Sequence, residues 1–337
     1  MPLSSTIHLH PPISTSLNPT PITYIIYHIT GNPGLVEYYR VFLTHLYGLL
    51  SDSSASSSPS RIFHVYGRSL SGFEVDGHDH ARVLNGPPYS LEQQITESLS
   101  CLLDLVKDRG TKDVRVILMG HSVGSYILLE IIRRVREKAA GIRIVGGICL
   151  FPTVTHIAKS ASGRKVTPLV ALPAFPLLVS LLAKALTLLV PTSLLGLLIR
   201  IFMNFPPDAA NVTASFVKSK HGVRQALYMT HDEMLTITDD VWDEEIWGAA
   251  KLSEKSDKRP VLRFLFAETD HWVANETRDE LIRVRGSMQE DDEVWKPKME
   301  IDFEYGWPHG FCIKHSVPVA ERVCGYVEDI IRSDLEG

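Results

Sequence analysis

A serine with a glycine two residues before it and another two residues after it constrains this chain more than any other feature. Residues 114–119 are apolar and rich in β-branched side chains, the next five read Gly-His-Ser-Val-Gly, and a largely apolar segment with helical spacing follows. The pattern predicts a strand, a sharp turn and a helix, with Ser122 at the turn in a strained conformation. A side chain at Gly120 or Gly124 would clash with the neighbouring strand and helix. We therefore predict that the Ser122 hydroxyl projects into an open site at the top of a sheet, beside a helix N-terminus.

Strand and helix patterns alternate on both sides of this turn. The length of 337 residues allows one α/β domain with an insertion, or two domains. Apolar runs predict the strands and apolar positions at helical spacing predict the helices, so we predict an α/β fold with a mostly parallel, doubly wound sheet. The predicted strands cover residues 22–30, 62–66, 114–119, 142–151, 261–266 and 299–305, and the predicted helices lie within residues 38–50, 90–110, 223–237, 241–247 and 317–335.

The alternation stops between residues 160 and 250. Two uncharged runs, residues 166–183 and 185–199, are separated only by Lys184 and contain several prolines. A helix needs about 20 apolar residues to cross a bilayer, so these runs of 18 and 15 residues do not predict two independent spans. They fit a lid over the serine, a hairpin or interfacial segment in a lipid monolayer, or a buried cap. Because their apolar content exceeds what a small cap can bury, we favour a combined lid and lipid-surface anchor.

These patterns divide the chain into three parts. Residues 1–21 are rich in serine, proline and threonine and are expected to be a flexible N-terminus. Residues 22–159 and 251–337 are expected to form the α/β core. Residues 160–250 are expected to form a hydrophobic helical cap, with the lid or membrane-association segment at about residues 166–206.

Composition and motifs exclude several classes of protein. The net charge is −5 and no block is rich in lysine or arginine, so nucleic acid is not an expected partner. The sequence has no Cys/His metal spacing, phosphate loop or dinucleotide fingerprint, so no metal or other cofactor is expected. The four cysteines form no Cys-X-X-Cys pair and predict a reducing compartment, and the first 20 residues lack the pattern of a signal peptide. The sequence does not indicate an oligomeric state.

A serine nucleophile needs a histidine base and an acid that orients the histidine. In a doubly wound sheet these groups follow the ends of later strands, in the chain order serine, acid, histidine. Asp270 comes shortly after the predicted strand 261–266 and is the expected acid, with Glu268 as its rival. Asp302 and Glu304 are disfavoured because they lie inside the predicted strand 299–305.

The expected base is His309. Of the 14 histidines, it alone combines the correct chain order with a position just after the last predicted strand. His271 adjoins the expected acid itself, and His315 lies nearer the last helix. A histidine that merely occupies a turn is the alternative interpretation.

The oxyanion of an acyl-transfer intermediate needs backbone N–H donors. One is expected from Val123, which follows the nucleophile, and one from the loop after the first strand, residues 31–34, which reads Gly-Asn-Pro-Gly. Proline has no N–H, so the second donor is expected to be Asn32 or a neighbour other than Pro33. An ordinary Asn-Pro-Gly turn is the alternative. His28 and His121 are expected to be packed rather than catalytic.

With these motifs in place, the chain resembles the lipid droplet-associated hydrolase family of the α/β-hydrolase superfamily. The resemblance runs over most of residues 22–334 and is most specific at residues 29–39, 89–95 and 151–163. It implies an α/β-hydrolase fold, with the nucleophile, acid and base at Ser122, Asp270 and His309. The sequence departs from the family in reading Asp-His-Trp where the family has Asp-Gly-Trp after the acid, and in an extra glycine and proline around the histidine.

The resemblance implies a serine esterase or lipase that hydrolyses neutral lipid esters, either sterol esters or acylglycerols, through an acyl-enzyme. Its expected partners are its lipid substrate and the surface of a lipid droplet monolayer or of the endoplasmic reticulum membrane, on the cytosolic face. Two alternatives stay open: a structural or regulatory droplet protein built on a hydrolase scaffold, and an acyltransferase that uses the same acyl-enzyme.

Overall fold

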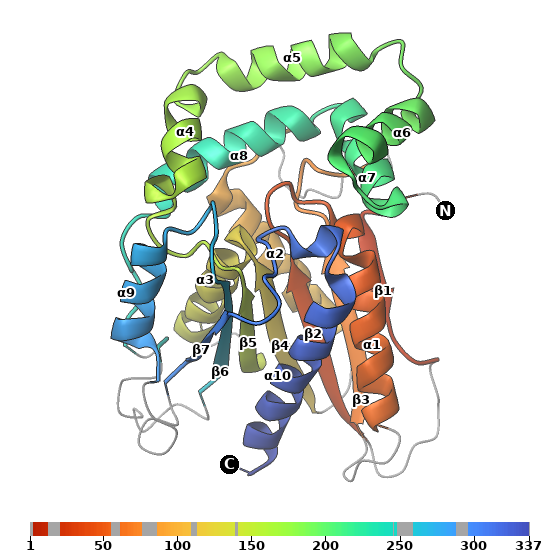
Figure 1. Ribbon diagram of the computed structural model, residues 1–337. Coiled ribbons are helices and arrows are strands. Elements are labelled where there is room, and N and C mark those ends of the chain that lie inside the picture. Colours follow the sequence, from red (N-terminus) through yellow and green to blue (C-terminus); the bar gives the residue numbers. More distant parts are fainter. Residues whose placement is uncertain are drawn as a thin grey trace.

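The protein is built on a seven-stranded sheet with helices on both faces and a helical cap at one end (Figure 1). The computed structural model describes residues 3–12, 21–54, 61–75, 86–108, 113–138, 141–244, 246–247, 259–287 and 296–336. The strand order is β1-β3-β2-β4-β5-β6-β7, and every strand is parallel to its neighbours except β1. This confirms the predicted α/β fold with a mostly parallel, doubly wound sheet. The strands are β1 (Thr6–Leu9), β2 (Ile22–Ile29), β3 (Arg61–Arg68), β4 (Val114–His121), β5 (Arg143–Leu150), β6 (Val261–Ala267) and β7 (Lys298–Asp302).

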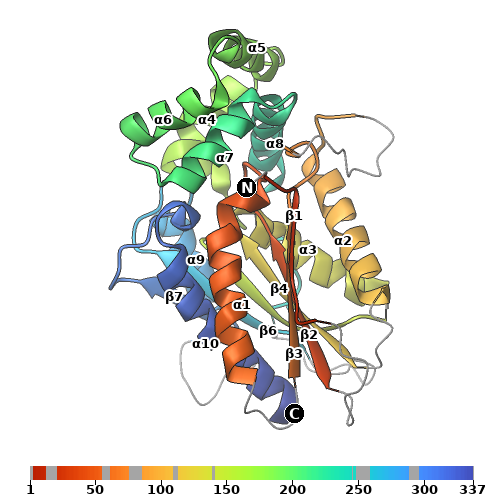
Figure 2. The ribbon, with the colours of Figure 1, turned by 90° about the vertical axis from the view of Figure 1, so that its right-hand side faces the viewer.

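The central strands are buried on both faces because each face is covered by its own layer of helices (Figure 2). On one face lie α1 (Arg40–Ser54), which follows the 3₁₀ turn η1 (Val36–Tyr39), and α10 (Ser316–Glu336), which follows η3 (Phe311–Ile313). On the other face lie α2 (Leu91–Lys107), α3 (Val123–Glu137) and α9 (Asn275–Arg285). Strands buried on both faces read as continuous apolar runs, which is why they were readable from the sequence.

The N-terminus differs from the prediction of a flexible segment at residues 1–21. Strand β1 lies within it and pairs antiparallel with β3, from Thr6 opposite Arg68 to Leu9 opposite Val65. Ile7 is buried against the α1 and α10 side of the sheet. A strand of only four residues leaves little periodicity to detect, so a Ser/Pro-rich context hid it. Residues 1–2 and 13–20 lie outside the described residues.

Two helix predictions have different outcomes. The start of α2 carries the predicted capping box: Ser90 Oγ accepts the Gln93 N–H, and the Gln93 side chain accepts the Ser90 N–H. The helix predicted at residues 241–247 is wrong, because the described residues there form irregular backbone and turns. Trp242 and Trp247 are both buried in this stretch, so the apolar spacing reflects two anchors in the core.

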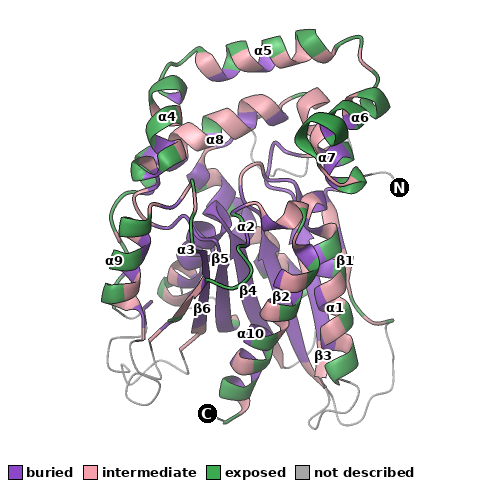
Figure 3. Cartoon of the chain, in the orientation of Figure 1, coloured by how far each residue is buried: buried purple, intermediate pink, exposed green. Residues whose placement is uncertain are grey.

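The described residues of the cap form five helices above the carboxyl ends of the parallel strands (Figure 1). A short 3₁₀ turn, η2 (Ile157–Lys159), leads into it. Figure 3 shows α6 as mostly exposed, α5 as a mixture of exposed and intermediate residues, and α8 as mostly intermediate. Among the described residues no single helix is long and apolar enough to cross a membrane, although α4 and α5 pass that test as a pair bent by 94°. The cap helices are α4 (Ala161–Val170), α5 (Phe175–Thr187), α6 (Thr192–Met203), α7 (Pro207–Lys218) and α8 (Gly222–Thr236).

The inner helix α8 is fastened to the core by side chains. Gln225 hydrogen-bonds both to the backbone N–H of Tyr89, at 2.6 Å, and to its carbonyl, at 2.8 Å. Asp232 accepts the N–H of Leu91 at 2.6 Å, at the start of α2. These contacts make α8 the fixed base of the cap. Helices α4, α5 and α7 contact it directly, and α6 packs on α7.

Replacement of glycine by alanine is expected to have opposite effects on stability at two positions of the core. A Cβ at Gly146 in β5 would lie 2.5 Å from Ile330 Cγ2 on α10, whereas a Cβ at Gly48 in α1 would meet nothing within 4 Å. We expect Gly146→Ala to lower the free energy of unfolding by about 1–3 kcal/mol through overpacking. Gly48→Ala should raise it by about 0.5–1 kcal/mol through helix propensity. Urea denaturation of both variants checks this, and equal effects would contradict the packing described for α10.

Candidate active site

Ser122 lies between the end of β4 and the start of α3, where the backbone turns sharply. Its φ of 53° and ψ of −124° are unusual for a residue with a side chain. A Cβ at Gly120 would lie 2.3 Å from the carbonyl oxygen of Gly124, and a Cβ at Gly124 would lie 2.4 Å from the carbonyl oxygen of Ile29. Only glycine fits at either position, so helix α3 begins in direct backbone contact with β2 and β4.

The structure brings Ser122, His309 and Asp270 together, although 187 residues separate the first two. His309 Nε2 lies 2.9 Å from Ser122 Oγ, and His309 Nδ1 lies 2.7 Å from Asp270 Oδ2. Because the carboxylate can only accept, Nδ1 carries the hydrogen and Nε2 is left as an acceptor for the serine hydroxyl. This geometry suits transfer of the serine proton to the histidine.

The serine is less open than the sequence predicts. Ser122 and His309 are each only 8% exposed, and the cap lies above this end of the sheet (Figure 1). The cap and the acid loop are also joined directly, since the Ser162 N–H donates to the carbonyl of His271 at 2.8 Å.

Asp270 is held as a carboxylate. Burial is the largest effect and would raise its pKa, but the hydrogen bond from His309, the charge of His309 and the N–H of Trp272 together hold the pKa below its usual value. Trp272 donates to the second carboxylate oxygen at 2.7 Å. Arg278 on α9 fixes the same loop by donating to the carbonyls of Ala267 and Glu268 at 2.8 and 2.6 Å. The rival acid Glu268 is exposed.

The loop that carries His309 is organised by Asp302, for which the sequence suggested only a position in a strand. Strand β7 ends at Asp302 and does not reach residue 305. The Asp302 carboxylate accepts the backbone N–H groups of Glu304, Tyr305 and Trp307 at 3.3, 3.0 and 2.7 Å. These bonds take up the donors that a longer strand would have used, so the chain turns and delivers His309 to Ser122.

The two expected oxyanion donors belong to two segments that both adjoin the sharp turn of residues 120–124, which we call the elbow. Val123 is the first residue of α3, and N–H groups in the first turn of a helix have no carbonyl partner within it. A Cβ at Gly31 would lie 3.1 Å from Ser122 Cβ, so the loop after β2, residues 31–34 (called the oxyanion loop below), packs directly on Ser122. The Asn32 side chain points the other way and donates to Ala226 O, Thr230 Oγ1 and Glu233 Oε1 of α8 at 3.1, 3.0 and 2.9 Å.

Glu233, which accepts one of these hydrogen bonds from Asn32, is a buried acid and is only 4% exposed. Burial raises its pKa to about 8, opposed by the hydrogen bond from Asn32 and reinforced by the charge of Asp232. The carboxyl is therefore largely protonated at neutral pH, and the cap is joined to the oxyanion loop by a neutral contact.

Sequence reasoning missed Glu233, Tyr39 and the hydrogen bonding of His121. Tyr39 Oη lies 2.6 Å from His121 Nδ1, and His121 Nε2 lies 2.8 Å from the carbonyl oxygen of His309. The position of His121 beside the nucleophile was the one available signal. No pattern in the sequence links Glu233 to Asn32, because their contact depends on how the cap folds back. Among the described residues, no group of three or more His, Cys, Asp or Glu side chains is arranged to hold a metal ion.

Solved structures define the class of fold. The peroxisomal α/β-hydrolase Lpx1 of Saccharomyces cerevisiae is similar with a TM-score of 0.60 and 11% identity, over 98% of this chain and 91% of that one. The haloalkane dehalogenase DbeA of Bradyrhizobium elkani is similar with a TM-score of 0.53 and 10% identity, over 97% and 99%. At such low identity the likeness shows the fold alone, and the fold is that of the α/β-hydrolases.

The sequence comparisons identify the family. The profile of the family described as lipid-droplet associated hydrolase matches residues 22–312. The lipid droplet-associated hydrolase of Mus musculus is 26% identical over 320 residues, covering 90% of this chain and 85% of the mouse protein. That of Dictyostelium discoideum is 24% identical, covering 90% and 87%. The match to the Gallus gallus protein is 28% identical and spans 62% of that protein's length. The chain therefore belongs to the lipid-droplet associated hydrolase family and is a hydrolase on an α/β-hydrolase scaffold.

Protonation of Glu233 makes stability depend on pH. The folded protein holds this proton up to about pH 8, whereas the unfolded chain releases it near the ordinary value of 4.5. The folded state therefore binds more protons between these values, and its stability falls as pH rises through that window. We expect Glu233→Gln to remove up to about 1.4 kcal/mol of this fall per pH unit. Denaturation of both proteins at several pH values checks it, and parallel profiles would contradict a protonated Glu233.

Proposed function

We propose that this protein is a serine hydrolase that cleaves carboxylic esters with Ser122 as nucleophile, His309 as base and Asp270 as the acid that orients it. The observation that carries this proposal is the continuous hydrogen-bonded chain from the serine hydroxyl through both ring nitrogens of His309 to a buried carboxylate. A serine hydroxyl is a poor nucleophile at neutral pH, and such a chain is the usual means of activating it.

In the proposed reaction, His309 Nε2 takes the proton of Ser122 as Oγ attacks the ester carbonyl. Asp270 stabilises the imidazolium ion that forms, since its carboxylate lies 2.7 Å from Nδ1. The tetrahedral intermediate then collapses, and His309 gives the proton to the leaving alcohol. Water repeats the same steps on the acyl-enzyme and releases the carboxylic acid.

The negative charge on the tetrahedral intermediate is proposed to be held by the backbone N–H groups of Val123 and Asn32. Both belong to segments in tight contact with the nucleophile, and neither segment can shift without steric clash or loss of the contacts to α8. A single such donor is typically worth about 3 kcal/mol in the transition state.

We propose neutral lipid esters, either sterol esters or acylglycerols, as the substrate class, met at the surface of lipid droplets and on the cytosolic face of the endoplasmic reticulum membrane. The names of the relatives associate those proteins with lipid droplets. In this chain the supporting feature is an exposed apolar surface on the outer cap, which we call the cap surface. Its members are all more than half exposed: Leu172, Leu178, Leu181, Leu182, Leu186, Leu188, Leu189, Ile201, Phe202 and Met203.

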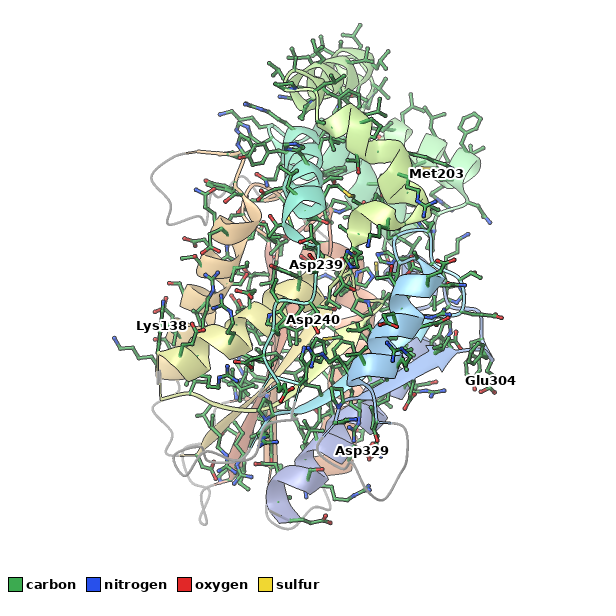
Figure 4. All side chains as sticks on the ribbon, turned by 90° about the vertical axis from the view of Figure 1, so that its left-hand side faces the viewer. Lys138, Met203, Asp239, Asp240, Glu304 and Asp329 are labelled. Atoms are coloured by element: carbon green, nitrogen blue, oxygen red, sulfur yellow. The ribbon has the colours of Figure 1, made fainter. Side chains whose placement is uncertain are left out.

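The cap surface gathers ten strongly exposed apolar side chains within residues 172–203. Leu189 is 91% exposed and Phe202 is 82% exposed, whereas ordinary folding buries such side chains. Figure 4 shows side chains projecting outward around α5, with the labelled Met203 on the outer side of the cap. At a lipid monolayer these side chains would leave water and insert into the lipid. The monolayer has only one aqueous face, so the segment would not need to cross to a second one.

The cap surface equally favours a second candidate function, that of a structural or regulatory droplet protein with little hydrolytic activity. A third possibility, acyl transfer to an alcohol, uses the same acyl-enzyme with an alcohol in place of water. Covalent labelling of the serine distinguishes the first two functions, and product analysis in the presence of an acceptor alcohol distinguishes the third.

The decisive test of the proposed function is covalent labelling by a fluorophosphonate probe. Wild-type protein should be labelled and should hydrolyse emulsified cholesteryl oleate or triolein. Ser122→Ala should abolish labelling and lower hydrolysis by at least about 10³-fold. Ser125→Ala, which removes a neighbouring hydroxyl bonded to the Gly120 carbonyl, serves as the control and should still be labelled. Absence of labelling in the wild type, both in detergent and on droplets, would favour the structural role.

Droplet binding tests the cap surface. The triple variant Leu186→Gln, Leu188→Gln and Leu189→Gln should float less with artificial droplets. Full burial of one leucine is worth at least ~1.5 kcal/mol, so partial burial of three still predicts a loss of partitioning of at least tenfold.

A matched control replaces three exposed apolar residues of the core helices, Val41, Leu103 and Val284, by glutamine. The control should float like the wild type. Equal flotation of both triple variants and the wild type would rule out the cap surface as the lipid-binding site.

A further inference from the structure

A second hydrogen-bonded chain runs beneath the elbow and joins the oxyanion loop to the loop of His309. The Gly31 N–H donates to Tyr39 Oη at 3.1 Å. Tyr39 Oη lies 2.6 Å from His121 Nδ1, and His121 Nε2 lies 2.8 Å from the carbonyl oxygen of His309. All four groups are buried.

The direction of each hydrogen bond in this chain follows from the last one, which His121 makes to the His309 carbonyl. The His309 carbonyl can only accept, so His121 Nε2 carries a hydrogen and donates it. In a neutral imidazole Nδ1 is then an acceptor, so the Tyr39 hydroxyl donates to it. The hydroxyl oxygen is left free to accept from Gly31. Every donor and acceptor in the chain is satisfied by a single tautomer of His121.

The surroundings of His121 favour that neutral tautomer. Burial, and next the charge of the nearby His309, hold the pKa of His121 well below its usual value. The ring is enclosed by aromatic groups, with ring centroids at 5.2 Å for Phe311, 5.7 Å for Tyr39 and 6.2 Å for Phe151. A cation there would lie beside His309, which itself becomes positive during the proposed reaction.

We propose that His121 and Tyr39 are positioning residues that hold the His309 loop and the oxyanion loop at a fixed distance from Ser122 while the proton moves. This inference rests on the proposed function, because it assigns both residues to the same reaction. His121 acts through the backbone of His309 and does not touch the reacting atoms. Tyr39 acts through Gly31, the residue directly before Asn32.

This second hydrogen-bonded chain also narrows the choice of backbone N–H that serves as oxyanion donor in the loop of residues 31–34. The Gly31 N–H is occupied by Tyr39, and Pro33 has no N–H. Among Gly31, Asn32 and Pro33, Asn32 is therefore the residue that we assign as the second donor. Its side chain is held by α8, and Gly31 before it is held by Tyr39. A loop fixed at two adjacent residues keeps its N–H aimed at one point, which electrostatic stabilisation of the oxyanion requires.

Steady-state kinetics on p-nitrophenyl butyrate with the full chain test the proposal. Because small misplacements of reacting groups cost up to ~10²-fold, Tyr39→Phe is expected to lower kcat by about tenfold and His121→Leu by about 100-fold, with KM changed less than about twofold. His121→Gln can still donate to the His309 carbonyl, so it should recover at least about tenfold of the loss in His121→Leu.

Tyr27→Phe is the matched control. It also removes one buried tyrosine hydroxyl, which donates to the Ser98 carbonyl at 3.0 Å away from the elbow. It should leave kcat within about twofold of the wild type while costing the ~1 kcal/mol of stability expected for any such hydroxyl. Equal kcat values for Tyr39→Phe and Tyr27→Phe, or no recovery in His121→Gln, would overturn the positioning role.

A second measurement separates failure of this inference from failure of the proposed function. In ¹⁵N-histidine-labelled protein, His121 assigned by difference with His121→Gln should show a protonated Nε2 and an unprotonated Nδ1 throughout the neutral pH range. A titrating signal or the opposite tautomer would overturn the positioning chain even if the wild type is an active esterase. A wild type that no fluorophosphonate labels would overturn the proposed function, and the positioning role with it.

Discussion

The site depends on one close contact, the approach of the first turn of α3 to the ends of β2 and β4. Without side chains at Gly120 and Gly124, backbone meets backbone, and Ser122 is held at a positive φ that costs roughly 1–3 kcal/mol by itself. The surrounding core stabilises this strain, since β4 and α3 are buried along nearly their whole length. A serine so constrained cannot swing away from its partners, and the other loops of the site are arranged around it.

Three loops converge on the elbow, and each is fixed by hydrogen bonds that lie outside the proposed path of proton transfer. Arg278 ties the Asp270 loop to α9, Asp302 folds the His309 loop, and α8 holds Asn32. The second chain through His121 joins two of these loops beneath the nucleophile. Such support from neighbouring groups is what keeps reacting atoms in position, and it explains why buried polar residues cluster at this edge of an otherwise apolar core.

The inner and outer helices of the cap have different surroundings: the inner helix contacts the core, and the outer helices face solvent. Its inner helix α8 is bonded to the core through Gln225, Asp232 and the neutral Glu233, so it moves little without breaking several hydrogen bonds. Its outer helices α5 and α6 expose leucines that water disfavours. A fixed inner layer and an apolar outer layer fit the proposed function at a lipid interface, because lipid would engage the outer helices while the oxyanion loop stays in place.

The sequence by itself determined the sheet, the elbow and the chain order of Ser122, Asp270 and His309, because buried parallel strands read as apolar runs and strand ends carry the polar groups. It did not determine β1, the turns at residues 241–247 or the end of β7, since a short edge strand, two buried tryptophans and the Asp302 turn carry no periodicity. Only the tertiary structure decided that Asn32 meets Glu233 and that Tyr39 meets His121. These contacts join residues 82 to 201 positions apart, and they exist only once the cap and the sheet have packed.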